Sequence, residues 1–109
     1  MAEEFVTLET AKLLKEKGFN ERKYLIDVST LNHCYKYLSV PPQSIAQKWL
    51  RETKNLHIEI PYMYGNYWIY DILTIPNHDL VGLSNRPIIH YNTYEEALEA
   101  GLQEALKLI

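Results

Sequence analysis

The sequence TYEEALEAGLQEALKLI, residues 93–109, predicts an amphipathic helix that needs an apolar partner surface. Its apolar residues recur at steps of three and four, which places one stripe along the helix: Tyr94, Ala97, Leu98, Gly101, Leu102, Ala105, Leu106 and Ile109. The opposite face, which we interpret as solvated, collects mainly Glu95, Glu96, Glu99, Gln103, Glu104 and Lys107. Thr93 followed by Glu96 matches a capping box, so we expect the helix to occupy about 94–107.

The centre of the chain supplies a partner surface, because residues 56–75 predict a β-hairpin. Residues 56–62 alternate, with Leu56, Ile58 and Ile60 on one face and His57 and Glu59 on the other. Tyr64-Gly65-Asn66 favours a turn, and YWIYDILTI, residues 67–75, forms the return strand. Both faces of this return strand are largely apolar or aromatic. We therefore expect the second face to be covered by another part of the chain or to bind a partner.

Two further amphipathic helices are predicted, at about 8–17 and 43–53. Thr7 and Gly18 suit the two ends of the first helix. In the second helix we interpret Trp49 as a core anchor rather than a binding residue.

The remaining segments are less regular. Residues 23–28 and 34–40 read either as a pair of short strands or as an irregular loop laid over the sheet edge. Residues 76–87 read as a loop with a β extension at Leu80-Val81, and residues 88–91 as a short last strand. Because strands and helices do not alternate as in a parallel sheet, the sequence predicts one α+β domain over residues 1–109. Its small antiparallel sheet, with the hairpin at about 56–75, would pack against two or three amphipathic helices.

Length and composition limit the classes of protein. A chain of 109 residues with 47% hydrophobic and 23% charged residues is typical of one globular domain. The net charge of −3 argues against binding to nucleic acid through phosphate contacts alone. The single cysteine, Cys34, allows no internal disulfide, and its neighbour His33 would point to the opposite face of a strand. With no secretory signal and no membrane-spanning apolar run, we expect a cytoplasmic protein without a membrane partner.

No catalytic or cofactor-binding motif rises above background. The four glycines are scattered, so no phosphate-binding loop forms, and one cysteine cannot supply a zinc cluster. We therefore expect no enzymatic activity and no cofactor. A minor alternative is a metal-binding or enzymatic site at His57 and Glu59, which lie two residues apart on one strand face, with His90 on a neighbouring strand.

Three segments together resemble a known family: TLETAKLLKEKGF (residues 7–19), QSIAQKWLRE (43–52) and YEEALEAGLQEALKLI (94–109). They are similar to short uncharacterised proteins of gut Bacteroidales bacteria and of their phages and mobile elements. Members often have Pro-Thr-Gln-Ser before the second helix, whereas this chain has Pro41-Pro42-Gln43-Ser44 and so lacks a capping hydroxyl. The resemblance covers little more than a third of the chain and implies a biological context, without an activity.

Our leading hypothesis is a small protein–protein interaction module. Its partner would be an unknown protein or a second copy of the chain in a homodimer. Because tyrosine and tryptophan supply large contact areas with few rotatable bonds, the candidate partner-binding residues are Tyr62, Tyr64, Tyr67, Trp68 and Tyr70. The alternative is a single-stranded nucleic-acid binder that uses Tyr35, Lys36 and Tyr37 with the basic helix faces around Lys12, Lys48 and Arg51.

Overall fold

The computed structural model describes residues 4–31, 36–81 and 89–109. Its helices are α1 (Leu8–Glu16), α2 (Gln43–Thr53) and α3 (Tyr94–Leu108), with short 3-10 helices η1 (Arg22–Tyr24) and η2 (Ser29–Leu31). Its strands are β1 (Leu25–Asp27), β2 (Tyr37–Ser39), β3 (Leu56–Glu59), β4 (Tyr62–Met63), β5 (Tyr67–Trp68) and β6 (Asp71–Thr74). Every pair of these strands is antiparallel, so the predicted α+β class is confirmed.

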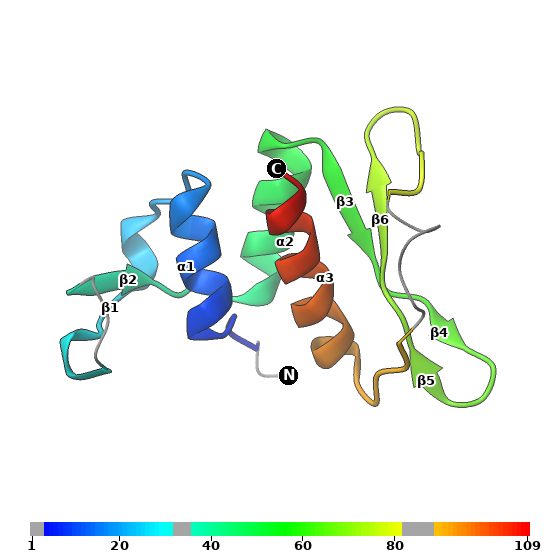
Figure 1. Ribbon diagram of the computed structural model, residues 1–109, viewed down its shortest axis with the longest axis horizontal. Coiled ribbons are helices and arrows are strands. Elements are labelled where there is room, and N and C mark those ends of the chain that lie inside the picture. The colour runs from blue at the N-terminus through cyan, green and yellow to red at the C-terminus, as the bar shows by residue number, and fades with distance from the viewer. Residues whose placement is uncertain (1–3, 32–35, 82–88) are drawn as a thin grey trace.

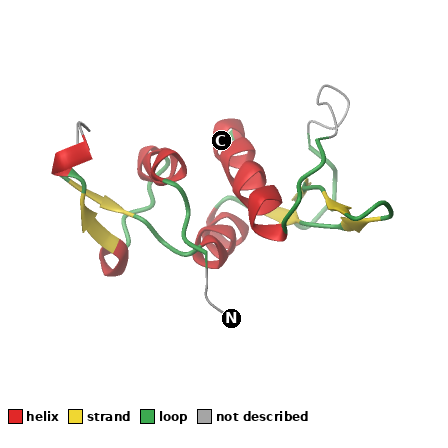
Figure 2. Ribbon diagram, turned by 90° about the horizontal axis from the view of Figure 1, so that it is seen from below, coloured by secondary structure: helices red, strands yellow, loops and turns green. Residues whose placement is uncertain are grey.

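The three helices lie in the middle of an elongated body of 42 × 29 × 27 Å (Figure 1). The β1–β2 ribbon lies beyond α1 at one end, and the β3–β6 hairpin lies beyond α3 at the other end. A view turned by 90° shows the same separation of the two strand regions (Figure 2). Among the described residues, no helix is both long and apolar enough to span a membrane.

The helix ends follow the predicted caps closely. The Thr7 hydroxyl accepts a hydrogen bond from the Thr10 N–H at 3.2 Å. At the other end of α1, Gly18 has a φ of 106°, and the Phe19 N–H donates to the Leu14 carbonyl at 2.9 Å. These contacts start and stop α1 within one residue of the predicted bounds.

The second helix begins where predicted although its N-cap, Pro42, has no capping hydroxyl. The Gln43 N–H instead donates to the Glu4 carbonyl at 2.8 Å, and the Val6 N–H donates to the Pro41 carbonyl at 3.0 Å. The N-terminal segment therefore satisfies a helix start that the local sequence leaves open.

The central hairpin is confirmed and keeps one register along its whole length. Leu56 pairs with Thr74, Ile58 with Ile72, Glu59 with Asp71, and Tyr62 with Trp68. Pro61 has no N–H, which interrupts the ladder between β3 and β4, although its carbonyl still accepts from the Ile69 N–H at 3.2 Å. The interruption divides the hairpin into a part against the helices and a projecting tip.

The apolar face of this hairpin packs against α3. Ile58 and Ile72 are fully buried with the α3 stripe, which consists of Ala97, Leu98, Gly101, Leu102, Ala105 and Leu106. A Cβ atom at Gly101 would lie 2.8 Å from Ile58 Cγ2 and 3.2 Å from Tyr70 Cβ, so glycine permits this close approach. Tyr94, which the periodicity assigns to the stripe, is instead 40% exposed.

The chain that follows the hairpin partly covers its second face and the outer edge of the return strand. Trp68 forms an antiparallel bridge with Tyr91, and Leu73 forms one with Leu80. The Leu80 bridge confirms the predicted β extension, and Leu73 is buried. The predicted last strand at 88–91 is wrong for its described part, because residues 89–91 contribute only the single bridge at Tyr91; Ile88 lies outside the described residues.

The segments 23–28 and 34–40 form strands, and the alternative of a loop over the sheet edge is wrong. They are shorter than predicted, since Arg22–Tyr24 is a 3-10 helix and β1 covers only Leu25–Asp27; residues 34 and 35 lie outside the described part. The ribbon packs beside α1, at the opposite end from the hairpin, and cannot cover the second hairpin face (Figures 1 and 2).

A polar junction joins α3 to the start of α1. Glu99 Oε2 accepts from the Thr7 N–H and the Thr7 hydroxyl, each at 3.0 Å, and from the Thr10 hydroxyl. Its Oε1 accepts from Gln43 Nε2 at 2.9 Å, and Gln103 Nε2 donates to the Thr10 hydroxyl at 3.0 Å. Glu99 and Gln103 thus lie at a helix interface, and their assignment to a solvated face is wrong. The carboxylate also faces the N-terminus of α1, where a negative charge is favoured.

Candidate functional site

The turn of the hairpin projects a fully exposed tyrosine, Tyr64, from the end of the body. The turn backbone is defined by Gly65 and Asn66, both at positive φ, and the Asn66 N–H donates to the Met63 carbonyl at 3.2 Å. The Tyr62 hydroxyl donates to Asn66 Oδ1 at 2.8 Å across the turn. These contacts hold Tyr64 on an ordered turn rather than on a loose loop.

Three more rings continue from the turn toward α3. The Tyr62 and Trp68 ring centroids lie 4.7 Å apart, and Trp68 meets Tyr94 edge-on at 5.5 Å. Both Trp68 backbone groups bond to Tyr91, with each N···O distance at 2.9 Å. We define the aromatic tip as Tyr62, Tyr64, Trp68 and Tyr94, which come from β4, the turn, β5 and the start of α3.

The five candidate residues of the sequence analysis do not all reach this tip. Tyr62, Tyr64 and Trp68 belong to it. Tyr67 points to the other hairpin face and stacks on His90, with the two ring centroids 3.6 Å apart. Tyr70 packs against the core beside Gly101. The sequence analysis did not include Tyr94 among the partner-binding residues. Its position gives a signal, because Tyr94 is the first residue of α3 and the buried stripe begins only at Ala97.

The electrostatic setting of the tip is acidic. Glu95 and Glu96 are exposed next to Tyr94 in the first turn of α3. Among the described residues from 56 to 109, the only Lys or Arg is Lys107, which lies about 20 Å away at the other end of the helix. A hollow of about 530 Å³ is lined by Tyr62, Met63, Tyr64, Gly65 and Asn66.

The structure does not assemble the predicted metal or enzymatic site. His57 lies opposite Leu73 and Glu59 opposite Asp71, whereas His90 stacks on Tyr67. Since Leu73 and Tyr67 are six residues apart on the return strand, His57 and His90 are separated by roughly 20 Å. No three metal-binding side chains come together in the part of the chain that the structure describes. His33 and Cys34 lie outside the described residues.

The residues of the nucleic-acid hypothesis lie on separate elements. Lys36 Nζ lies 5.4 Å from the centroid of the Tyr37 ring on the ribbon, while Lys12 belongs to α1 and Lys48 to α2. Tyr35 lies outside the described residues.

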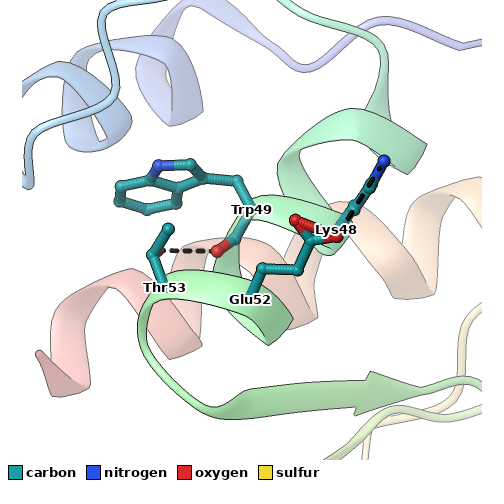
Figure 3. Close-up of polar contacts among 4 residues, drawn as sticks. All are labelled: Lys48, Trp49, Glu52 and Thr53. Atoms are coloured by element: carbon teal, nitrogen blue, oxygen red, sulfur yellow. Dashed lines mark hydrogen bonds and ion pairs between the residues drawn. The ribbon is translucent and has the colours of Figure 1, made fainter.

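Trp49 packs as an anchor on the helical body. Its ring meets Phe19 edge-on at 5.7 Å, and it contacts the core cluster while keeping partial exposure. On the same helix the Thr53 hydroxyl donates to the Trp49 carbonyl at 2.6 Å, and Lys48 pairs with Glu52 at 3.9 Å (Figure 3). These are local helix contacts of a packing residue.

Comparison with protein-family models, with curated proteins and with solved structures finds no match to this chain.

Proposed function

We propose that this chain is a non-enzymatic protein-binding module that docks on a partner protein through the aromatic tip. The observation that carries the proposal is the full exposure of Tyr64 on a turn whose backbone and neighbouring rings are held in place. Tyrosine and tryptophan side chains have only two torsion angles and lose little conformational entropy on binding, which is one reason why they dominate binding hot spots.

The partner that suits this surface presents arginine or lysine side chains. A cation is attracted to the faces of tyrosine and tryptophan rings, and the exposed carboxylates of Glu95 and Glu96 add attraction from the side. The resemblance of the three helical segments favours a role in a phage or mobile element, where the module would act inside the cell.

A random peptide library selected against the purified chain tests this proposal, because the selection itself reveals the chemistry of the ligand. We expect the recovered peptides to be rich in arginine or lysine and to lose about tenfold or more in affinity on Tyr64→Ala or Tyr62→Ala. Binding should also weaken with added salt because part of the attraction is electrostatic.

The control is Tyr37→Ala, since Tyr37 is 51% exposed and Tyr62 57% exposed, but at opposite ends of the molecule. Thermal unfolding should show that all three variants stay folded. Peptides that bind the tip variants and the wild type equally well would contradict the proposal, as would a selection that enriches no sequence.

A further inference from the structure

The outer edge of β1 is open. The Tyr24 carbonyl accepts from the Val40 N–H at 2.9 Å, and the Val28 N–H donates to the Lys36 carbonyl at 2.8 Å. Because backbone groups alternate along a strand, Leu25 and Asp27 direct theirs away from β2. No described strand pairs with this edge, and all three residues of β1 are exposed.

An apolar groove of about 770 Å³ runs beside this open edge. It is lined by Phe5, Lys23, Tyr24, Leu25, Ile26, Val40, Pro42 and Ile45. Ile26 is paired with the buried Leu38, so the two side chains lie on the same side of the ribbon. The core-facing side of the ribbon is therefore left uncovered along β1, where Ile26 and the nearby Phe5 of the N-terminal segment are both exposed.

We propose that β1 of a second copy adds to this edge in antiparallel register, with the two-fold axis at Ile26, to give a four-stranded sheet in a homodimer. In this register the Asp27 N–H donates to the carbonyl of the partner's Leu25, and by symmetry the N–H of the partner's Asp27 donates to the Leu25 carbonyl. The Leu25 N–H is already donated to the Arg22 carbonyl, so it needs no new acceptor. The partner's Ile26 lies beside Ile26 on the core-facing side and covers the groove.

The charges at the two ends of β1 favour a copy of the same strand over an unrelated segment. Lys23 precedes β1 and Asp27 ends it. Antiparallel pairing brings the partner's η1, which carries Lys23 two residues before Leu25, to the Asp27 end of β1, within reach of a long side chain, and symmetry repeats this ion pair. Ser29 holds the Asp27 carboxylate in place, with its N–H at 2.9 Å and its hydroxyl at 2.7 Å.

Sedimentation or light scattering over a range of concentrations tests the proposal, with Ile26→Lys as the disrupting variant. We expect the wild-type mass to rise toward that of two chains, and Ile26→Lys to raise the dimer Kd by about tenfold or more. The matched control is Leu108→Lys, because Leu108 is 46% exposed and Ile26 45% exposed. A wild type that stays monomeric at every concentration would overturn the proposal, as would a dimer that Ile26→Lys leaves intact.

A charge exchange tests the register itself. Lys23→Asp and Asp27→Lys should each weaken the homodimer, since each creates like-charge pairs, and the double variant should regain it. An equimolar mixture of the two single variants should form heterodimers, because each strand then meets opposite charges at both ends. Homodimers of both single variants as strong as the wild type would refute this register.

Discussion

The two ends of this molecule treat their strand edges in opposite ways. At the hairpin end, the chain that follows pairs with the outer edge of the return strand, Tyr91 with Trp68 and Leu80 with Leu73, and on the first strand the Ile58 carbonyl accepts from Gln47 Nε2 at 2.7 Å. At the ribbon end, no described strand pairs with the outer edge of β1, and Ile26 is exposed. An open edge is a template for another strand, whereas a closed edge can present only side chains. The difference teaches that the ribbon end suits backbone pairing and the hairpin end suits recognition by rings.

The sharpest test of this contrast compares two tyrosines of the hairpin. Tyr70→Ala removes a ring packed against Gly101 and the core, so we expect a loss of about 2–4 kcal/mol in the free energy of unfolding. Tyr64→Ala removes a fully exposed ring and should change it by less than about 0.5 kcal/mol. Denaturant unfolding measures both, and equal losses would show that the tip is not separate from the core.

The next test concerns the helical body that separates the two ends. Glu99→Ala removes the acceptor of the Thr7 N–H and of the Thr10 hydroxyl and leaves Gln43 Nε2 only the Glu95 carbonyl, which should cost about 1–3 kcal/mol in the free energy of unfolding. The control Glu95→Ala alters an exposed carboxylate of the same helix. NMR signals of the Trp49 indole on the helical body and of the Trp68 indole on the hairpin should report unfolding at one common midpoint. Different midpoints would show that the hairpin and the helical body unfold independently.

A smaller loss is expected where α3 meets the hairpin. Gly101→Ala places a Cβ 2.8 Å from Ile58 Cγ2, and overpacking outweighs the better helix propensity of alanine. We expect a net loss of about 1 kcal/mol in the free energy of unfolding. Ala100→Gly, one position away, tests propensity alone. A more stable Gly101→Ala variant would mean that the hairpin shifts to accept the methyl group.

The smallest effect concerns Asp27 at the open end. Its hydrogen bonds from Ser29 lower the pKa of the carboxyl below its ordinary value of 3.8. A folded-state pKa below the unfolded one contributes stability above pH 3.8, and this is lost as the pH falls through the folded pKa. We expect Asp27→Asn to lower the Tm slightly near neutral pH and to match the wild type in strong acid. A Tm difference that persists in acid would point to another cause.

Local periodicity predicts the elements of this fold better than their arrangement. The three helices and the hairpin register follow from apolar spacing, Gly18 and the turn residues, all of which act over a few positions. The position of the ribbon beyond α1, and the docking of Glu99 on the start of α1, depend on contacts between residues far apart in the sequence, such as Thr7 and Glu99. No local pattern encodes such contacts.

The candidate site shows the same limit. The hairpin turn and its tyrosines are visible in the sequence, but alternation alone cannot say which ring packs on α3 and which stays exposed. Gly101 decides that for Tyr70, because only a residue without a side chain lets the strand come so close. Tyr94 joins the tip because α3 begins at that residue, and the buried stripe starts one turn later.

The placement of ribbon and hairpin at opposite ends of a 42 Å body has a consequence for avidity. Two copies joined at β1 would carry their aromatic tips at the far ends of a rod roughly twice that length. Such a rod is bivalent, so its apparent affinity rises strongly for a partner that repeats along a filament, a shell or a membrane surface. The second tip would add no affinity for a partner present as a single copy.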